Sequence, residues 1–259
     1  MLSSGILNRL VMSAYYDTYD YPSYWKGREY EHASEIIAIT YFLKKVPKIE
    51  NILEIGAGFG RLTESYLELA PKITLTDPSS KLLQIASRNI KRKGVRFIHS
   101  KLENLPVRFK EEFDLAILVR VLHHLEDMDN CFQSVNQLLQ NRGYFILEFP
   151  NKCHWKATFR EFIKGNFTFL LDIFPIDLRH SKSKRNIPFI NYHPEVIKHK
   201  LNENGFKIIE VRSVSNFRNK FLKAAIPRKF LLLLEKWGQK PLARINFGPS
   251  EFILAQKIG

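Results

Sequence analysis

A run of three alternating glycines behind a short apolar segment most constrains how this chain can fold. In NILEIGAGFGRLT, residues 51–63, the apolar run contains one acid, Glu54, and is followed by Gly56, Gly58 and Gly60. Glycine adopts positive φ without strain and lets a ligand lie against bare backbone. A helix beginning just after the loop would point its free amides at the same place and favour an anion. We therefore expect a strand, a ligand-binding loop and a helix in succession.

Apolar runs and helical periodicity alternate along most of the chain. The continuous apolar run at 113–121 is typical of a strand buried on both faces. Further strands are expected at 51–55, 72–77, 95–100, 144–149, 206–214 and 251–257. Helices are expected at 29–46, 60–70, 79–93, 127–142 and 193–205. This repeated order of strand and helix predicts an α/β fold with a parallel, doubly wound sheet.

The charge of the chain is unevenly distributed. Lys and Arg outnumber Asp and Glu by 40 to 26, and nearly all of this excess lies in residues 151–259. Such asymmetry is typical of proteins that meet an anionic partner or substrate. A solvated basic surface that binds nothing in particular explains it equally well.

Residues 221–241 combine an apolar helical face with basic residues. Pro227 is expected to open a helix and Gly238 to close it. One face of this helix carries Phe230, Leu233, Leu234 and Trp237, with Arg228, Lys229 and Lys236 beside it. Two uses of the face stay open. It packs on the protein core or on a second copy of the chain, or it lies on an anionic membrane surface.

The sequence lacks the features of a membrane-spanning or exported protein. No stretch of about 20 consecutive apolar residues occurs, so no transmembrane helix is expected. Residues 1–20 have neither the basic start nor the long apolar centre of a signal peptide. Cys131 and Cys153 do not form the pattern of a disulfide framework or a zinc site, and no metal is expected. We expect a cytoplasmic location and leave peripheral attachment at the inner membrane surface open.

The spacing of the glycines distinguishes between two classes of nucleotide ligand. Dinucleotide-binding loops follow the pattern G-x-G-x-x-G, whereas here glycines occupy alternate positions after Glu54. This pattern resembles the first motif of the class I S-adenosylmethionine-dependent methyltransferases, in their small-molecule, methyltransferase type 11-like branch. The resemblance continues in the same order through LTDPS (75–79), FIHSKLENLP (97–106), FDLAILVRVLHHLED (113–127), NRGYFILEFPNK (141–152), NYHPEVIKHKLNENGFKIIEV (191–211) and GPSEFILAQK (248–257).

The resemblance implies a Rossmann-like, doubly wound sheet of seven strands with the last strand antiparallel, plus cap insertions. It implies a single domain with four parts. These are an N-terminal helical lid over 1–49, a cofactor-binding core over 50–150, a cap insertion over 151–190, and a closing helix and strands over 191–259 that are interrupted by an insertion at 215–248. We expect both insertions to lie over the active edge of the sheet.

By the same resemblance, S-adenosylmethionine is the expected cofactor. The implied contacts are Glu54, Gly56, Gly58 and Gly60 in the loop, Asp77 on the ribose, Lys101 and Leu102 beside the adenine, Val119 in the fourth-strand motif and Arg28 on the methionyl carboxylate. Lys101 replaces the acid that is usual in the family, and a lysine cannot accept a hydrogen bond from the adenine amino group. Structural alternatives stay open: Asp77 caps the next helix, nearby amides satisfy Glu54, and Arg28 faces solvent.

Three histidines are candidate catalytic bases. His123 and His124 follow the fourth strand, and His193 precedes Pro194. A base is needed only if the methyl acceptor must lose a proton, and histidine titrates near neutral pH. The alternatives are a structural role for the histidine pair and a helix-capping role for His193.

The expected function is transfer of a methyl group to a small or lipid-like acceptor, which the aromatic residues of 15–25 and 151–190 would suit. The alternative is a non-catalytic protein of this fold that binds nucleic acid or an anionic membrane through its basic C-terminal half. Nucleic acid is the less favoured partner, because no RNA-reading module is recognisable. In addition, LVRVLHHL, residues 118–125, stands where some nucleic-acid methyltransferases carry a tetrad such as N-P-P-Y. The sequence leaves the oligomeric state open.

Overall fold

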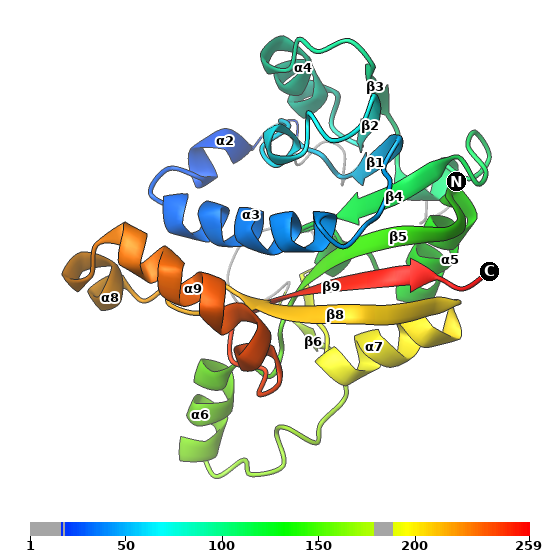
Figure 1. Ribbon diagram of the computed structural model, residues 1–259. Coiled ribbons are helices and arrows are strands. Elements are labelled where there is room, and N and C mark those ends of the chain that lie inside the picture. The colour runs from blue at the N-terminus through cyan, green and yellow to red at the C-terminus, as the bar shows by residue number, and fades with distance from the viewer. Residues whose placement is uncertain (1–16, 18, 179–188) are drawn as a thin grey trace, which may run out of the picture.

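A seven-stranded sheet forms the centre of the protein (Figure 1). The computed structural model describes residue 17 and residues 19–178 and 189–259. Across the sheet the order is β3-β2-β1-β4-β5-β9-β8. The strands are β1 (Asn51–Ile55), β2 (Lys72–Asp77), β3 (Val95–His99), β4 (Phe113–Leu118), β5 (Leu139–Pro150), β8 (Phe206–Val214) and β9 (Ser250–Lys257). The first five pair in parallel, and β9 runs antiparallel to both β5 and β8. The predicted doubly wound sheet with an antiparallel last strand is confirmed.

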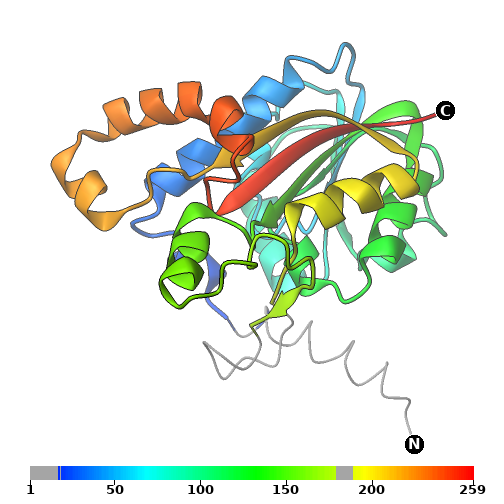
Figure 2. The same ribbon diagram turned by 90° about the horizontal axis from the view of Figure 1, so that it is seen from below.

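Helices cover both faces of this sheet (Figures 1 and 2). On one face lie α3 (Glu29–Leu43) and α9 (Arg228–Ala243), on the other α5 (Met128–Leu138) and α7 (Pro194–Glu203), and α4 (Ser80–Asn89) packs beside β2 and β3. Each face of the sheet has its own hydrophobic core, and β4 contributes side chains to both. Leu115 and Ile117 belong to the cluster under α3, and Ala116 and Leu118 belong to the cluster under α5. All four are fully buried, which explains the uninterrupted apolar run in the sequence.

The segment after the glycine loop is not the predicted helix. Turns and one short 3-10 helix, η1 (Thr63–Ser65), occupy residues 60–70. The backbone hydrogen bonds here join residues three positions apart, as in a 3-10 helix, with Tyr66 N donating to Thr63 O at 3.1 Å. The hydroxyls of Thr63 and Tyr66 both donate to the Glu54 carboxylate in β1. These tertiary bonds fix the turns, so the helix dipole expected beside the loop is absent from this segment.

Other predicted boundaries move by smaller amounts. The strand predicted to reach residue 121 ends at Leu118, and the helix predicted to reach residue 142 ends at Leu138, where β5 begins. Ser79 caps α4, since its Oγ accepts a hydrogen bond from Leu82 N at 3.2 Å. The start of this helix, predicted at residue 79, is therefore within one residue of the observed start at Ser80.

Two insertions leave the sheet at its carboxyl edge. The first contains α6 (Trp155–Ile163), β6 (Ile176–Asp177) and β7 (Ile190–Asn191), and the second contains α8 (Lys220–Ala225) and α9. In both ribbon views α6, α8 and α9 project to the left of the strands. Helix α9 packs on α3 and β8, and the expected position of the insertions over the active edge stays a prediction. Parts of the predicted lid and cap, residues 1–16, 18 and 179–188, lie outside the described residues.

Helix α9 turns its predicted apolar face outward. Its exposed side chains include Phe230, Leu233, Leu234 and Trp237, whereas its buried ones are Leu231, Glu235, Gln239 and Ala243. The prediction that this apolar face packs on the core is therefore wrong. The reason is a polar anchor: the Glu235 carboxylate accepts hydrogen bonds from Tyr30 Oη at 2.6 Å and Ser215 N at 2.8 Å.

The end of α9 also differs from the prediction. The helix does not close at Gly238 but continues to Ala243. Gln239 Nε2 donates to the backbone carbonyl of Ser34 in α3 at 2.8 Å, and this bond holds the last turns in place. No helix in the described part of the chain is both long and apolar enough to cross a membrane.

Candidate functional site

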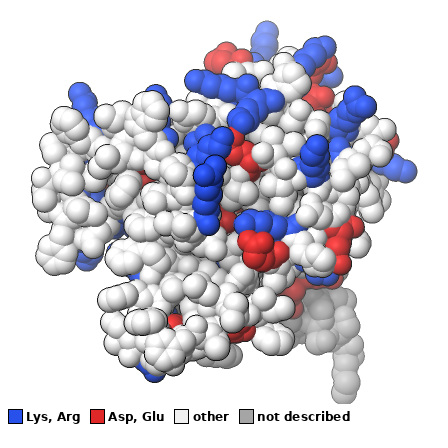
Figure 3. Space-filling view, turned by 60° about the horizontal axis from the view of Figure 1, so that its bottom comes forward, with Lys and Arg blue, Asp and Glu red and all other residues white. Residues whose placement is uncertain are grey.

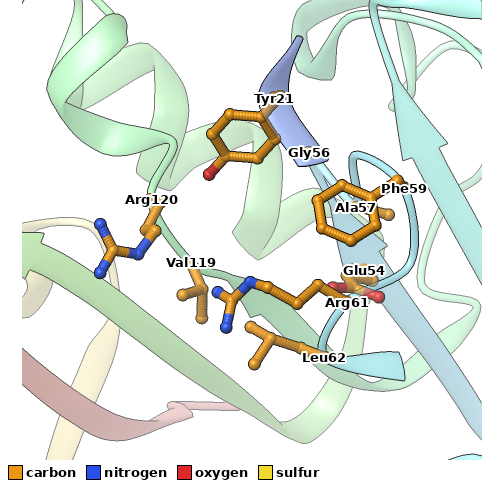
Figure 4. Close-up of a pocket in the computed structure, with 9 residues that line it drawn as sticks. All are labelled: Tyr21, Glu54, Gly56, Ala57, Phe59, Arg61, Leu62, Val119 and Arg120. Atoms are coloured by element: carbon orange, nitrogen blue, oxygen red, sulfur yellow. The ribbon is translucent and has the colours of Figure 1, made fainter. Parts of the chain in front are cut away.

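The carboxyl ends of β1 and β4 meet around a pocket. The neighbours of β1 are β2 on one side and β4 on the other, and the chain order reverses here, at the place where open α/β sheets bind ligands. Figure 4 shows the pocket, which is lined by Tyr21, Glu54, Gly56, Ala57, Phe59, Arg61, Leu62, Val119 and Arg120. Three of the predicted site residues, Glu54, Gly56 and Val119, are brought together here.

The three glycines of the loop are favoured for different reasons. Gly56, Gly58 and Gly60 all have positive φ, of 71°, 58° and 80° respectively. A Cβ at Gly56 would lie 2.2 Å from Val121 Cγ2, so close packing already requires that glycine. A Cβ at Gly58 would meet its nearest neighbour, the Tyr21 ring, at an ordinary contact distance of 3.8 Å. At Gly58 the backbone conformation, rather than close packing, favours glycine.

Asp77 ends β2 directly beside this loop. Its Oδ2 accepts a hydrogen bond from Gly58 N and its Oδ1 one from Ser79 N, both at 2.8 Å. Burial raises the pKa of Asp77 to about 6. The carboxylate thus orders the loop and the turn into α4. Each oxygen of a carboxylate accepts a second hydrogen bond, so the same group can also receive ligand hydroxyls.

Glu54 is buried in the pocket wall. Its Oε2 accepts from Thr63 Oγ1 at 2.7 Å and from the Tyr66 hydroxyl. Burial raises the pKa of Glu54 to about 7. The hydroxyls, rather than the backbone amides we considered from the sequence, satisfy this acid. Glu54 therefore fixes the turns after the loop and at the same time borders the pocket.

Two arginines of the pocket share one buried carboxylate, a feature that we did not foresee from the sequence. Glu35 lies on α3 and is 1% exposed. Its Oε2 pairs with Arg61 at 2.6 Å, and its Oε1 pairs with Arg120 at 2.6 Å. Burial alone would raise the pKa of Glu35, but the two guanidinium groups hold it below its ordinary value. Both guanidinium groups also lie over the Trp25 ring, at 3.5 and 4.6 Å from its centroid.

In this cluster one carboxylate faces two guanidinium groups, while Glu54 in the pocket wall and Glu148 beside Arg120 are the further acids nearby. A desolvated cation attracts an anionic group of a ligand more strongly than it would in water. No sequence signal identified the cluster. Glu35 occupies a polar position in a helical pattern, and its partners lie 26 and 85 residues away.

Arg120 occupies a strained position just past β4. It has a positive φ of 61°, which is uncommon outside glycine and often marks functional sites. Its backbone N donates to Glu148 Oε2 at 2.7 Å, and Ser250 Oγ donates to Glu148 Oε1 at 2.5 Å. Glu148 is the single acid in the apolar run 144–149, and this irregularity could have identified it. Together these bonds hold the Arg120 side chain at the pocket.

Other predicted cofactor contacts lie outside the pocket lining. Arg28 stands at the start of α3 with its guanidinium carbon 4.1 Å from the centroid of the Tyr24 ring. Lys101 precedes the 3-10 helix η2 (Leu102–Asn104), and Leu102 is buried in the core under α5. Lys101 and Leu102 follow the carboxyl end of β3, Arg28 does not, and none of the three lines the pocket.

His123 and His124 form a pair after β4, in the 3-10 helix η3 (Leu122–His124). Their ring centroids are 3.9 Å apart, and the Phe189 ring lies 4.6 Å from that of His123. His123 is buried, and its Nδ1 has no hydrogen-bond partner among the described residues. Burial lowers the pKa of His123 well below its usual value, so the imidazole is neutral at pH 7 and is a weaker base than an ordinary histidine.

His193 caps a helix. It precedes Pro194 at the start of α7, and its Nδ1 accepts a hydrogen bond from Glu195 N at 3.2 Å. Its Nε2 lies 3.1 Å from the carbonyl oxygen of Leu170, which makes this nitrogen the protonated one. Both nitrogens are engaged with backbone, so the geometry favours the capping interpretation over a role as base.

Comparison with known proteins identifies the family of the central segment. Residues 53–147 match the family model described as a methyltransferase domain. A demethylmenaquinone methyltransferase of Chlamydia pneumoniae is 31% identical over 109 residues, which cover 40% of this chain and 47% of that protein. A ubiquinone biosynthesis O-methyltransferase of Pelagibacter ubique is 24% identical over 101 residues, which cover 39% of this chain and 42% of that protein. The chain thus spans about half the length of these curated relatives, or less.

A solved structure extends the likeness in fold to the whole chain. The 1,6-didemethyltoxoflavin-N1-methyltransferase of Burkholderia thailandensis, solved with 1,6-didemethyltoxoflavin and S-adenosylhomocysteine, superposes with a TM-score of 0.61 at 18% identity. The match covers 100% of this chain and 92% of that one. The resemblance to class I S-adenosylmethionine-dependent methyltransferases is confirmed by the family model and by this fold.

Proposed function

We propose that this chain, whose residues 53–147 belong to the methyltransferase domain family, transfers a methyl group from S-adenosylmethionine to a small or lipid-like acceptor. The observation that carries the proposal is the 2.8 Å bond between Gly58 N and Asp77, beside a pocket that contains two arginines. Asp77 and Gly58 lie beside the pocket lining, next to Gly56 and Ala57, which belong to it, and Arg61 and Arg120 bring positive charge. These groups match the ribose and the carboxylate of the cofactor.

Particular residues would hold the cofactor. Asp77 would accept the ribose hydroxyls, and the backbone at Gly58 would lie against the ligand. Arg61 and Arg120 face the pocket (Figure 4). They are better placed than Arg28 to hold the methionyl carboxylate, because guanidinium groups bind planar anions in a fork.

The remaining chemistry concerns the acceptor. When bound, S-adenosylmethionine supplies an activated methyl group on its sulfonium. The chain must hold an acceptor atom in line with that group and exclude water, which contributes several kcal/mol, up to roughly 7–11 in ideal models. Of the histidine pair, His124 is the more suitable group to take a proton from an acceptor hydroxyl, because burial lowers the pKa of the neighbouring His123 and makes it a weak base.

An aromatic acceptor is favoured within this class. The relatives named above act, by their names, on demethylmenaquinone or in ubiquinone biosynthesis. The Phe189 ring beside the histidine pair and the Tyr21 and Phe59 rings of the pocket would suit a planar molecule. The alternative, a non-catalytic protein of this fold, is not favoured, since it would have no need of the loop, Asp77 and the arginine pair together.

Calorimetry with S-adenosylmethionine, NAD and FAD tests the first part of the proposal. Binding of S-adenosylmethionine alone is expected, whereas tight binding of NAD with no response to S-adenosylmethionine would overturn it. A methyl-transfer assay with labelled donor, run against separated metabolite, lipid and RNA fractions, tests the acceptor. Label that enters only RNA or protein would refute a small or lipid-like acceptor.

A further inference from the structure

The outward side of the second insertion is apolar and basic. We define the α8–α9 outer face by the exposed side chains of Phe221, Phe230, Leu233, Leu234 and Trp237. Trp237 is 74% exposed and Phe221 is 83% exposed, values that are uncommon for large apolar residues. A contiguous apolar patch of this kind usually marks an interaction site. In Figure 3 the left of the molecule is almost entirely white, with blue side chains at its edges.

The orientation of α9 is fixed from inside. Glu235 accepts hydrogen bonds from Tyr30 Oη, Ser215 N and Asn216 N at 2.6, 2.8 and 3.1 Å. Gln239 donates to the carbonyl of Ser34 one turn further along the helix. Rotating the helix to bury its apolar side would break all of these bonds. The outer face is therefore built into the fold and does not result from loose packing.

The exposed charge within the insertion itself has one sign, while Glu29 and Glu31 of α3 lie near its Arg228 and Lys223. Residues 217–247 contain Glu235 as their single acid, and it is buried. Basic side chains that are exposed in the same stretch include Arg228, Lys229, Lys236, Lys240 and Arg244. Apolar side chains interleaved with lysine and arginine and free of exposed acids are the pattern of helices that lie in the headgroup region of a membrane.

The first insertion adds to this surface. Helix α6 exposes Phe159, Phe162 and Ile163 and lies on the same side of the strands as α8 and α9 (Figures 1 and 2). Its first residue, Trp155, stacks on Phe247, just past α9, with ring centroids 5.6 Å apart. Two insertions that are distant in sequence thus present apolar side chains together.

We propose that the α8–α9 outer face docks on an anionic lipid bilayer, with Trp237 and Leu233 in the interface and the basic side chains at the headgroups. Helix α9 has 16 residues and is about 24 Å long, shorter than the roughly 30 Å hydrocarbon core, so it lies along the surface. A second copy of the chain is the less suitable occupant, because a symmetric contact would bring the same lysines and arginines against one another. This inference concerns docking and does not depend on the proposed methyl transfer.

Flotation of the full chain with vesicles tests the docking. The vesicles are phosphatidylcholine alone and phosphatidylcholine mixed with phosphatidylglycerol, at low and high salt. Binding to the mixed vesicles that fades with salt is expected. The double variant Lys229→Gln, Lys236→Gln should bind about 30-fold more weakly at low salt, since each cation contributes about fivefold near an anionic leaflet. The matched control Lys91→Gln, Lys93→Gln neutralises two exposed lysines outside the face and should bind like the parent.

The apolar contribution needs a separate variant. Leu233→Glu combined with Trp237→Glu should abolish flotation and leave the thermal midpoint unchanged, because both side chains are exposed. Val107→Glu, at a side chain that is 93% exposed outside the face, is the control and should float normally. The readout is independent of cofactor binding, which calorimetry measures on the same variants.

Three outcomes would overturn the inference. The first is absence of flotation with either kind of vesicle. The second is flotation that persists unchanged in the Leu233→Glu, Trp237→Glu variant, which would move the contact elsewhere. The third is a dimer of the parent chain that Leu233→Glu dissociates, without vesicle binding, which would make the face a contact between two copies.

Discussion

Strand β4 and helix α9 both carry runs of apolar residues. Strand β4 buries them inside the protein, whereas α9 exposes most of them at its surface. The side chains from Leu115 to Leu118 in β4 are fully buried between two helical layers. In α9 the apolar side chains of Leu233 and Trp237 face outward, while Glu235 is buried. Water is excluded from β4 by the protein itself. On α9 it remains in contact with the apolar face unless another surface covers that face.

The glycine-loop site and helix α9 use buried acids differently. Asp77 at the end of β2 accepts two backbone amides and keeps acceptor capacity toward the glycine loop. Glu235 in α9 accepts from five donors on four residues: Tyr30, Ser215, Asn216 through its backbone N and Nδ2, and Gln239. A buried carboxylate therefore indicates a ligand site only where its neighbours leave part of it available. In α9 the acid is a structural anchor.

A pair of leucine substitutions gives the largest expected contrast between β4 and α9. Leu115→Ala removes a fully buried side chain, so the free energy of unfolding should fall by about 2–5 kcal/mol. Leu233→Ala removes a side chain that is 50% exposed, and the loss should be about 0.5 kcal/mol or less. Urea unfolding measures both. Equal losses would mean that α9 packs its apolar face on the protein in solution.

Asp77→Ala separates a ligand-binding acid from a structural one. Loss of the acceptors for two ribose hydroxyls should weaken S-adenosylmethionine binding by about 3 kcal/mol, or roughly 100-fold, in calorimetry. The matched control is Asp114→Ala. Asp114 also accepts hydrogen bonds from two backbone amides, those of Glu50 and Asn51, at 2.9 and 2.8 Å. It lies near the start of β4, at the end of the strand away from the pocket. If both variants lose affinity equally, the effect is one of stability and the site lies elsewhere.

Glu235→Ala probes the anchor of α9. Removing the carboxylate leaves the Tyr30 hydroxyl and the Ser215 and Asn216 amides without their acceptor, so the free energy of unfolding should fall by about 2–3 kcal/mol. Affinity for S-adenosylmethionine should stay unchanged in the protein that remains folded. Glu235→Gln keeps one acceptor oxygen and should recover part of the loss. A fall in cofactor affinity without a fall in stability would contradict the structural role.

Glu54 should give a pH-dependent effect. Its pKa in the folded protein is raised to about 7, so the folded state favours the protonated carboxyl. The associated stability is fully present below the ordinary glutamate pKa and is lost as the pH rises through 7. We expect a loss of about 2–3 kcal/mol over this range, measured by urea unfolding. Glu54→Gln, which cannot ionise, should remove this slope, and an unchanged slope would assign it to another group.

The sheet could be predicted from the sequence because its signals are local. Each strand is a short apolar run, and the glycine loop and Asp77 mark the carboxyl ends of β1 and β2. The direction in which α9 faces could not be predicted in this way. Periodicity indicates that Phe230, Leu233 and Trp237 share a side, but it carries no information about what that side contacts. The orientation of α9 is fixed by hydrogen bonds to Glu235, and one of the donors, Tyr30, lies 205 residues away from it in the sequence.

The candidate site was predictable to a similar extent. Glu54, Gly56 and Val119 line the pocket as the family resemblance implied, and their roles toward a cofactor stay predictions. The pairing of Glu35 with Arg61 and Arg120 could not be predicted, because it joins three segments that meet only once the sheet has formed. The helix predicted after the loop is absent for a similar reason. Two hydroxyls of that segment donate hydrogen bonds to Glu54 in β1, a tertiary contact that periodicity does not reveal.

The position of β9 affects the order in which the chain can be completed during synthesis. Strand β9 holds residues 250–257, yet it lies between β5 and β8 in the sheet. While the ribosome makes the preceding residues, at roughly 5–20 per second, β5 has an open edge and β8 has no partner strand. Helix α9 packs on this part of the sheet, and its Glu235 accepts a hydrogen bond from the turn after β8. Until β9 is added, the sheet on which α9 packs is incomplete. The nascent chain therefore exposes both a strand edge and the apolar side of α9 until its last strand has emerged, and this interval is when a chaperone would be most needed.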